Sequence, residues 1–233
     1  MPVQQKQNIK GFTLLELLVI VAIISVLAGI GFPQFNKWQR DREIRVQAEK
    51  ITNLFTTATT QVERGAYPYV RIEFATTSPG QIIVKGITQD LLSKKINGPT
   101  DPACSVADFT NASNYQVDEI ASHTLNDKTY IPTLAPKAGQ TSVGSGGAIC
   151  FSKGGKYFKQ HLSADLQGNI GFDNNTSAAT NNYVTVCHLS SSKCDAVSKS
   201  FDDDYPTYLV RYSRFGLITK YKWNIKTLDW SSQ

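Results

Sequence analysis

The stretch "KGFTLLELLVIVAIISVLAGIGFP", residues 10–33, is an apolar segment that carries one carboxylate close to its start. Residues 12–32 form an apolar run of 21 residues in which Glu16 is the one charged residue. As a helix this run would measure roughly 31 Å, enough to cross a bilayer. A charged side chain in such a segment costs about 2.5–3.5 kcal/mol at the centre of a membrane and less near an end. We therefore expect Glu16 to have a partner that offsets this cost.

The composition indicates a folded chain. Of its 233 residues, 41% are hydrophobic and 18% are charged, which differs from the composition of disordered proteins. About 200 residues follow the apolar segment, enough for one domain of ordinary size. The net charge of +5 is modest and does not by itself require a nucleic-acid partner.

The N-terminus permits interpretations that need no special family. In a secretory signal peptide, Lys6 and Lys10 would form the basic region, and Val26, Leu27 and Ala28 would form a cleavage site. Glu16 interrupts the apolar region, however, and that region is longer than usual. A plain signal anchor leaves Glu16 unexplained, although its carboxylate could also extend to the lipid headgroups.

The same stretch resembles the class III signal and first helix of type IV pilins and type II secretion pseudopilins. The features that carry the resemblance, over residues 6–40, are a short basic leader, the Gly11–Phe12 junction, Thr13, Glu16 as fifth residue after that junction, and Pro33 near the end of the apolar run. The resemblance implies that a prepilin peptidase cleaves after Gly11 and methylates the new amine of Phe12. Residues 1–11 would then be the leader peptide.

The resemblance also supplies a partner for Glu16. In the filaments of this family, the carboxylate at this position is placed to pair with the N-terminal amine of a neighbouring subunit, here that of Phe12. An unpaired charge in an apolar medium is costly, and a positive amine offsets that cost. The pair would also define the axial position of a subunit during assembly, which the apolar helix otherwise specifies poorly.

We expect the helix to continue beyond the membrane. After residue 34 the pattern becomes amphipathic, with apolar residues mostly three or four positions apart: Phe35, Trp38, Ile44, Val46, Ala48, Ile51, Leu54, Phe55, Ala58 and Val62. Gly65 is suited to a C-cap, and Pro68 follows it. The sequence thus predicts one helix over residues 12–65, with residues 12–32 in the membrane and a bend near Gly29, Gly31 and Pro33.

The remainder, residues 66–233, is predicted to be a β-rich head domain. "YVRIEFAT" (69–76) and "GQIIVKG" (80–86) should form a hairpin, because a Ser-Pro-Gly turn signal lies between them. Further predicted strands are residues 148–153, 168–172, 182–189, 207–214 and 217–224, with a short helix near residues 117–121 in a loop-rich region. The expected class is α+β, a pilin-like long helix packed on an antiparallel sheet.

A further resemblance concerns the branch of the family. "AEKITNLFTTATTQVERGAYPYVRIEF", residues 48–74, is similar to the H-type pseudopilins and FimT-like minor pilins, in which the helix ends before a hairpin. This resemblance implies a minor subunit of a type IV pilus or of a type II secretion pseudopilus.

The cysteines predict disulfides, because four of them lie in a domain expected to be exported. The spacing of Cys187 and Cys194 suits a bridge across a turn, which would leave Cys104 to pair with Cys150, although four cysteines permit three connectivities. In a metal alternative, His188 would join Cys187 and Cys194 as a zinc ligand. The run of residues 202–204, "DDD", could hold calcium or form a solvated loop.

The C-terminal strands carry basic residues among aromatic ones. Lys220 and Lys222 share one face of a strand, and Tyr221 and Trp223 share the other, so the aromatics could be core and the lysines a solvated edge. A functional alternative is a basic strip for DNA phosphates, since cations interleaved with aromatics suit nucleic acid. Its candidate residues are Arg211, Arg214, Lys220 and Lys222, because some FimT-like minor pilins bind DNA through C-terminal arginines.

No recognised catalytic motif is present, and an enzyme that is secreted or anchored to the membrane is a minor alternative. We therefore predict a structural subunit without a cofactor. Its expected partners are other pilin or pseudopilin subunits, the prepilin peptidase, the assembly platform of the inner membrane, the membrane itself and, in the alternative function, DNA. The expected location is the bacterial inner membrane, with the head domain in the periplasm, and then the filament.

Overall fold

The computed structural model describes residues 12–75, 80–96, 104, 117–131, 148–155, 159–161, 182–195 and 200–233. The chain divides into two compact units, Met1–Gln39 and Arg40–Gln233, which are treated separately below. The predicted leader, including Gly11, and the predicted strand over residues 168–172 lie outside the described residues.

Helix α1, Leu14–Glu63, is the first element, and it agrees closely with the predicted helix. It begins where Thr13 caps it: the Thr13 hydroxyl accepts a hydrogen bond from the Glu16 N–H at 3.2 Å. Among the described residues, no single helix meets the length and hydropathy of a membrane span. Two segments on either side of a bend, Leu14–Gly29 and Gln34–Glu63, meet these criteria together.

The end of α1 has the backbone geometry that glycine favours. The Gly65 N–H donates to the Val62 carbonyl at 3.0 Å, and the Ala66 N–H donates to the Gln61 carbonyl at 3.1 Å. These two bonds form a Schellman motif, in which the residue after the helix adopts a left-handed conformation. Gly65 has a φ of +76° and fills that position, so the predicted cap is confirmed.

The first sheet has the strand order β3-β2-β1-β5-β6, and its neighbours are antiparallel. Its strands are β1 Tyr69–Ala75, β2 Gln81–Ile87, β3 Val117–Thr124, β5 Ala148–Ser152 and β6 Lys159–His161. The predicted hairpin is confirmed as β1 and β2. The short helix predicted near residues 117–121 is wrong, because these residues pair with β2 as an edge strand.

The second sheet has the order β12-β11-β10-β7-β4, again with antiparallel neighbours. Its strands are β4 Thr129–Tyr130, β7 Tyr183–His188, β10 Thr207–Tyr212, β11 Ile218–Asn224 and β12 Asp229–Ser232. A small ribbon joins β8, Cys194–Asp195, to β9, Ser200–Phe201. Helix α2, Gln89–Ile96, and a 3-10 turn, Lys153–Gly155, complete the described elements and were not predicted.

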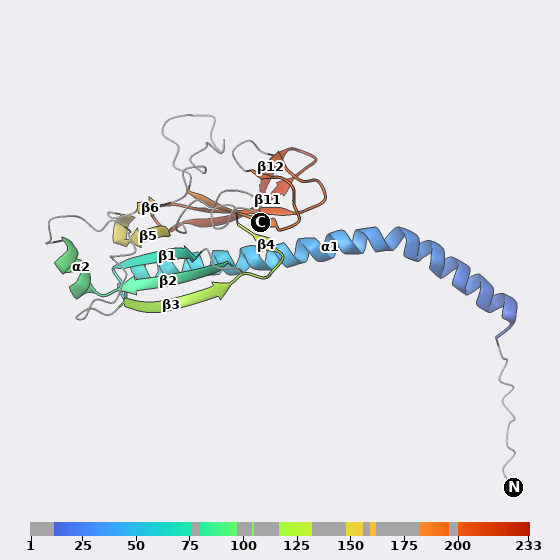
Figure 1. The fold of residues 1–233 in the computed structure, drawn as a ribbon, viewed down its shortest axis with the longest axis horizontal. Coiled ribbons are helices and arrows are strands. Elements are labelled where there is room, and N and C mark those ends of the chain that lie inside the picture. Colours follow the sequence, from blue (N-terminus) through green and yellow to red (C-terminus); the bar gives the residue numbers. More distant parts are fainter. Residues whose placement is uncertain are drawn as a thin grey trace, which may run out of the picture. The chain divides into compact units, whose positions relative to one another are not determined.

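The main core of the second unit lies between α1 and both sheets (Figure 1). Ile44, Ile51 and Phe55 of α1 are fully buried, and the Phe55 ring lies near the rings of Phe74, Phe151 and Tyr212. Phe35, Trp38 and Val46, which were predicted on the apolar face, are exposed by 56%, 56% and 37%. A long helix followed by antiparallel sheets is the predicted α+β, pilin-like architecture.

Candidate assembly site

The first part of α1 presents a large uncovered apolar surface. Its large apolar side chains are exposed by 43–85%, and they are Phe12, Leu14, Leu15, Leu17, Leu18, Val19, Ile20, Val21, Ile23, Ile24, Val26, Leu27, Phe32, Phe35 and Trp38. A single soluble chain rarely exposes a continuous apolar patch of this extent. The surface therefore requires a membrane or other protein chains to cover it.

Glu16 lies in the first turn of α1 and is exposed. Thr13 and Glu16 have the Thr-x-x-Glu spacing of a capping box, a motif visible in the sequence that the sequence analysis missed, and the structure shows the bond from the Glu16 N–H to the Thr13 hydroxyl. The positive end of the helix dipole also favours an acid here. Among the described residues, none forms an ion pair with the Glu16 carboxylate.

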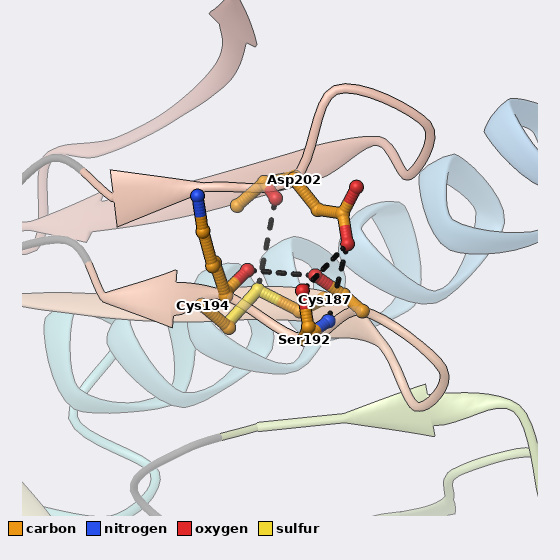
Figure 2. The surroundings of a disulfide bond; sticks show 7 residues. Cys187, Ser192, Cys194 and Asp202 are labelled. Atoms are coloured by element: carbon orange, nitrogen blue, oxygen red, sulfur yellow. Dashed lines mark hydrogen bonds between the residues drawn. A yellow bond between two sulfur atoms is a disulfide. The ribbon is translucent and has the colours of Figure 1, made fainter.

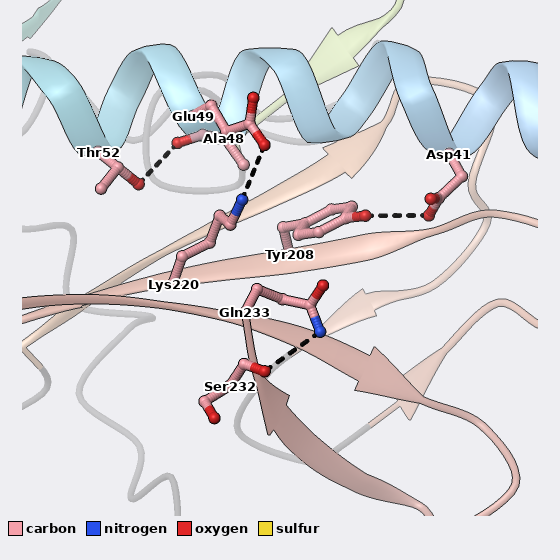
Figure 3. Close-up of polar contacts among 8 residues, drawn as sticks. All are labelled: Asp41, Ala48, Glu49, Thr52, Tyr208, Lys220, Ser232 and Gln233. Atoms are coloured by element: carbon pink, nitrogen blue, oxygen red, sulfur yellow. Dashed lines mark hydrogen bonds and ion pairs between the residues drawn. The ribbon is translucent and has the colours of Figure 1, made fainter.

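Polar contacts join the second unit's part of α1 to the second sheet. The Lys222 ammonium lies 2.6 Å from the Asp41 carboxylate, and the Tyr208 hydroxyl donates to the same carboxylate at 3.1 Å. Further along α1, the Glu49 carboxylate lies 2.9 Å from the Lys220 ammonium (Figure 3). The lysine face of β11 therefore lies over the helix, and its predicted position on a solvated edge is wrong.

The aromatic residues of β11 lie on the opposite face of the same sheet. Trp223 packs against Phe201 and Trp230, with ring centroids 4.6 and 5.2 Å away, and Tyr221 lies at the margin of this second apolar cluster. The alternation predicted for this strand is thus correct. α1 covers the lysine side of β11, and on the other side Phe201 of the β8–β9 ribbon packs against Trp223, beside its cross-strand neighbour Trp230.

The two candidate arginines are exposed on β10 and the turn after it. Arg211 pairs across the ladder with Thr219, and with Tyr221 it lines a cavity of about 240 Å³ on the aromatic face. The guanidinium carbon of Arg214 lies 4.6 Å from the ring centroid of Phe215. The structure therefore does not bring Arg211, Arg214, Lys220 and Lys222 together on one surface, because the lysines are on the helix-facing side.

The structure pairs the cysteines as Cys104–Cys150 and Cys187–Cys194, which is the predicted arrangement. With both sulfur atoms in a disulfide, Cys187 and Cys194 offer no thiolate to a metal. His188 is instead held by protein contacts: its Nδ1 accepts the Ser190 N–H at 3.1 Å, and its ring stacks on Tyr205 at 4.8 Å. Burial lowers the pKa of His188, so the imidazole is neutral at pH 7.

Asp202 fixes the loop that the second disulfide closes (Figure 2). Its Oδ2 accepts hydrogen bonds from the Ser192 N–H at 3.2 Å and from the Ser192 hydroxyl at 3.0 Å, and its Oδ1 accepts the Asp204 N–H at 3.2 Å. Burial alone would raise the pKa of Asp202, but these hydrogen bonds outweigh it and hold the pKa below its ordinary value. The Asp202 carboxylate thus holds the loop in place through these hydrogen bonds. Among the described residues, no cluster of three metal-ligating side chains occurs.

Comparisons with known proteins identify the N-terminal segment. Residues 6–32 match the family model described as the prokaryotic N-terminal methylation motif. The chain is 36% identical over 56 residues to a fimbrial protein of Pseudomonas aeruginosa, which covers 24% of this chain and 36% of that protein. It is 46% identical over 52 residues to the type IV major pilin protein PilA of Myxococcus xanthus, 22% of each chain.

A third relative is the type IV major fimbrial protein FimA of Dichelobacter nodosus, 49% identical over 41 residues, 17% of this chain and 26% of that protein. The chain thus spans between about a fifth and a third of the length of these relatives, and no solved structure matches it. Over its N-terminal segment the chain is thus similar to type IV pilins, and it carries the prokaryotic N-terminal methylation motif.

Proposed function

We propose that the chain is the precursor of a filament subunit, cleaved after Gly11, methylated at the amine of Phe12 and retained in the membrane by residues 12–32. The observation that carries this proposal is the methylation motif over residues 6–32, together with an apolar helix surface whose one carboxylate, Glu16, forms no ion pair with a described residue. A processing step that creates a free amine at Phe12 would supply a cation close in sequence to Glu16.

The chemistry of assembly follows from this pairing. In a bundle of apolar helices, sliding one helix past another changes the contact energy little, because most side chains are exchangeable aliphatic groups. A carboxylate and an amine that must both be neutralised select one axial position, since any other position leaves two charges unpaired. Glu16 is in the first turn of α1, close in sequence to Phe12, so each subunit can offer its acid to one neighbour and its amine to another.

The finer assignment is also a proposal. We place the chain among the minor subunits of a type IV pilus or a type II secretion pseudopilus, on the similarity of residues 48–74 to the H-type and FimT-like branch. Its partners would be other subunits, the prepilin peptidase and the assembly platform of the inner membrane, with the head domain in the periplasm. Two disulfides in the described head suit an oxidising compartment.

DNA binding is the alternative function that the sequence suggests, and it stays a prediction. Two of its four cations are engaged with α1, since Lys220 pairs with Glu49 and Lys222 pairs with Asp41. Arg211 and Arg214 remain the exposed cations of the group. No contact in the described residues favours DNA over the structural function.

Filaments sheared from cells test the proposed function. The chain should be found in the sheared fraction, by immunoblot, in the cleaved form. A Gly11→Val variant should accumulate in the membrane and be missing from that fraction, because the peptidase of this family needs a small residue before the cleaved bond. A Gly29→Val variant is the control for an added side chain elsewhere in the apolar helix, since a Cβ at Gly29 meets no atom within 4 Å. Equal amounts of the wild type and the Gly11→Val variant in sheared filaments would overturn the proposal.

A further inference from the structure

The turn between β10 and β11 is fixed by hydrogen bonds and carries exposed apolar side chains. Phe215 and Leu217 are exposed by 63% and 71%. The Ser213 hydroxyl accepts the Phe215 and Leu217 N–H groups at 3.2 and 3.0 Å, and the Ser213 N–H donates to the Leu217 carbonyl at 2.9 Å. A turn that is fixed before any partner arrives loses less entropy on binding. We call residues 213–217 the tip.

The tip packs against the last part of α1. Gly216 has a φ of +84°, and a Cβ built on it would lie 3.0 Å from the Thr59 Cβ. The chain enters the second unit at Arg40, and Thr59 lies 19 residues further along α1, roughly 28 Å as a helix. The tip therefore lies at the end of the head opposite to the point where the chain enters it.

Cations lie beside the apolar side chains of the tip. The guanidinium carbon of Arg214 lies 4.6 Å from the ring centroid of Phe215. The Arg214 backbone oxygen borders the 3-10 turn Lys153–Gly155, in which Lys153 is exposed. Arg211, near the end of β10, is exposed as well. Three cations thus lie on or near the tip.

The other charges at this end of α1 do not offset these cations. Glu63 and Arg64 are both exposed, and their charges are of opposite sign. Neither the tip, "SRFGL", nor the 3-10 turn, "KGG", contains an acidic residue. The surface around the exposed apolar side chains therefore has a net positive charge.

Polar and aromatic groups follow the apolar side chains along the two strands. Arg211 pairs across the ladder with Thr219, and both line a cavity of about 240 Å³ together with Leu217 and Tyr221. Guanidinium and hydroxyl groups donate hydrogen bonds to phosphate oxygens, and Arg and Tyr side chains favour the headgroup level of a bilayer. An apolar turn followed by such side chains matches the order of layers that a bilayer presents from its interior outwards.

The size of the apolar surface favours a lipid over a protein partner. Specific protein interfaces bury about 1,000 Å² or more, which two side chains at a hairpin turn do not supply. A fluid bilayer needs no complementary shape, and its affinity for a peripheral group increases with the inserted apolar area and with the attraction between cations and anionic lipids.

We propose that the tip binds an anionic lipid surface. Phe215 and Leu217 insert between the headgroups, and Arg211, Arg214 and Lys153 contact the lipid phosphates. Because the tip lies opposite to the entry of the chain into the head, this surface belongs to a second membrane and not to the one proposed to hold residues 12–32. The inference goes beyond the proposed function and does not depend on it, since the contact needs the head alone.

Capture of the full chain by vesicles tests the contact. The chain is purified in nanodiscs of phosphatidylcholine, which cover its apolar helix, and is mixed with vesicles that are then floated on a density gradient. Vesicles that contain phosphatidylglycerol should capture the chain, and vesicles of phosphatidylcholine alone should capture roughly tenfold less or lower, because the cations lose their attraction. Equal capture by both kinds of vesicle, or capture by neither, would overturn the inference.

Matched variants separate the apolar and the charged contributions. Phe215→Ser combined with Leu217→Ser should lower capture by the anionic vesicles roughly tenfold, because the inserted apolar area is lost. Arg214→Gln should lower it about fivefold, the effect of one cation near an anionic surface. Leu228→Ser and Lys226→Gln make the same kinds of change at exposed positions in the turn after β11, and as controls they should leave capture unchanged. Equal capture of the wild type and the double serine variant would contradict the insertion.

Fluorescence distinguishes insertion into lipid from binding to another polyanion. In vesicles with brominated acyl chains, Phe215→Trp should lose more fluorescence than the wild type, because bromine quenches only an indole that reaches the acyl chains. No additional loss would overturn the inference. Capture that salt abolishes and that the double serine variant retains would indicate a polyanion such as DNA as the partner, and would also overturn it. Gly11→Val in sheared filaments tests the proposed function separately, because vesicle capture requires neither cleavage nor a filament.

Discussion

Glu16 combines a charge, an exposed position and the first turn of a helix in one residue. Its local role is to occupy the last position of the capping-box spacing, where a neutral Gln is equally compatible with the helix start. Its proposed role between subunits depends on the charge itself. The two roles can therefore be separated by substitutions that keep the shape of the side chain and change its charge.

Glu16→Gln and Glu16→Val should both insert into the membrane at least as well as the wild type, since a costly charge is removed. Incorporation into sheared filaments should fall by more than tenfold for both, because the Phe12 amine of the neighbour loses its partner. Ser25→Val, which adds apolar volume on the same helix, serves as the control. Normal incorporation of Glu16→Gln would show that the cap, and not the charge, is what the filament requires.

Asp41 is the acceptor on which two partners from the second sheet converge. Asp41→Ala should lower the free energy of unfolding by about 1–3 kcal/mol, because the buried Tyr208 hydroxyl then has no acceptor for its hydrogen. Tyr208→Phe should cost less, since it removes the hydroxyl together with its need for a partner. Thermal unfolding of the full chain in detergent measures both, with the exposed Asp203→Ala as control. An equal loss in Asp41→Ala and Asp203→Ala would contradict this account of the α1 contacts.

At the scale of elements, local signals predict α1, β1, β2, β7, β10 and β11 because each carries a clear period. The Thr13 cap and the Gly65 cap mark where α1 begins and ends. Residues 117–121, "VDEIA", contain several helix-compatible residues, and only their pairing with β2 makes them a strand. Such pairing depends on distant residues, which local propensity does not report.

The face of a strand is likewise not decided by its alternation. In β11 the period of two separates Lys220 and Lys222 from Tyr221 and Trp223 correctly. This period does not show that Asp41 and Glu49, which the helical pattern places among the solvated residues of α1, form ion pairs with the two lysines. The predicted DNA strip fails as one surface for this reason, and the Glu16 site was predicted because its signal is local.

The two disulfides close chain segments of different lengths. Non-reducing digestion of the full chain should yield Cys187 linked to Cys194, and Cys104 linked to Cys150. Cys187 and Cys194 are 7 residues apart in the sequence, and Cys104 and Cys150 are 46 residues apart. In the chain-entropy model their removal costs about 2 and about 4 kcal/mol, so Cys104→Ser with Cys150→Ser should lower the unfolding temperature more than Cys187→Ser with Cys194→Ser. The reverse order, or free thiols at any of the four positions, would contradict this account.

At the scale of the whole molecule, the two parts of α1 have different surroundings. Its first part offers an uncovered apolar surface and one carboxylate, and its second part is the central element of a disulfide-bonded head. Everything proposed for the first part requires that residues 1–11 are removed, because only then does Phe12 have a free amine. Processing is therefore the premise that the assembly mechanism depends on.

The intact mass of the chain extracted from membranes, with sequencing of its N-terminal peptide, tests that premise most directly. The account predicts that the mature chain begins at Phe12 and is one methyl group heavier than its sequence. The Gly11→Val variant should keep residues 1–11 and lack the methyl group. A wild-type chain that begins at Pro2, or one cleaved after Ala28 as a signal peptide would be, would contradict the account.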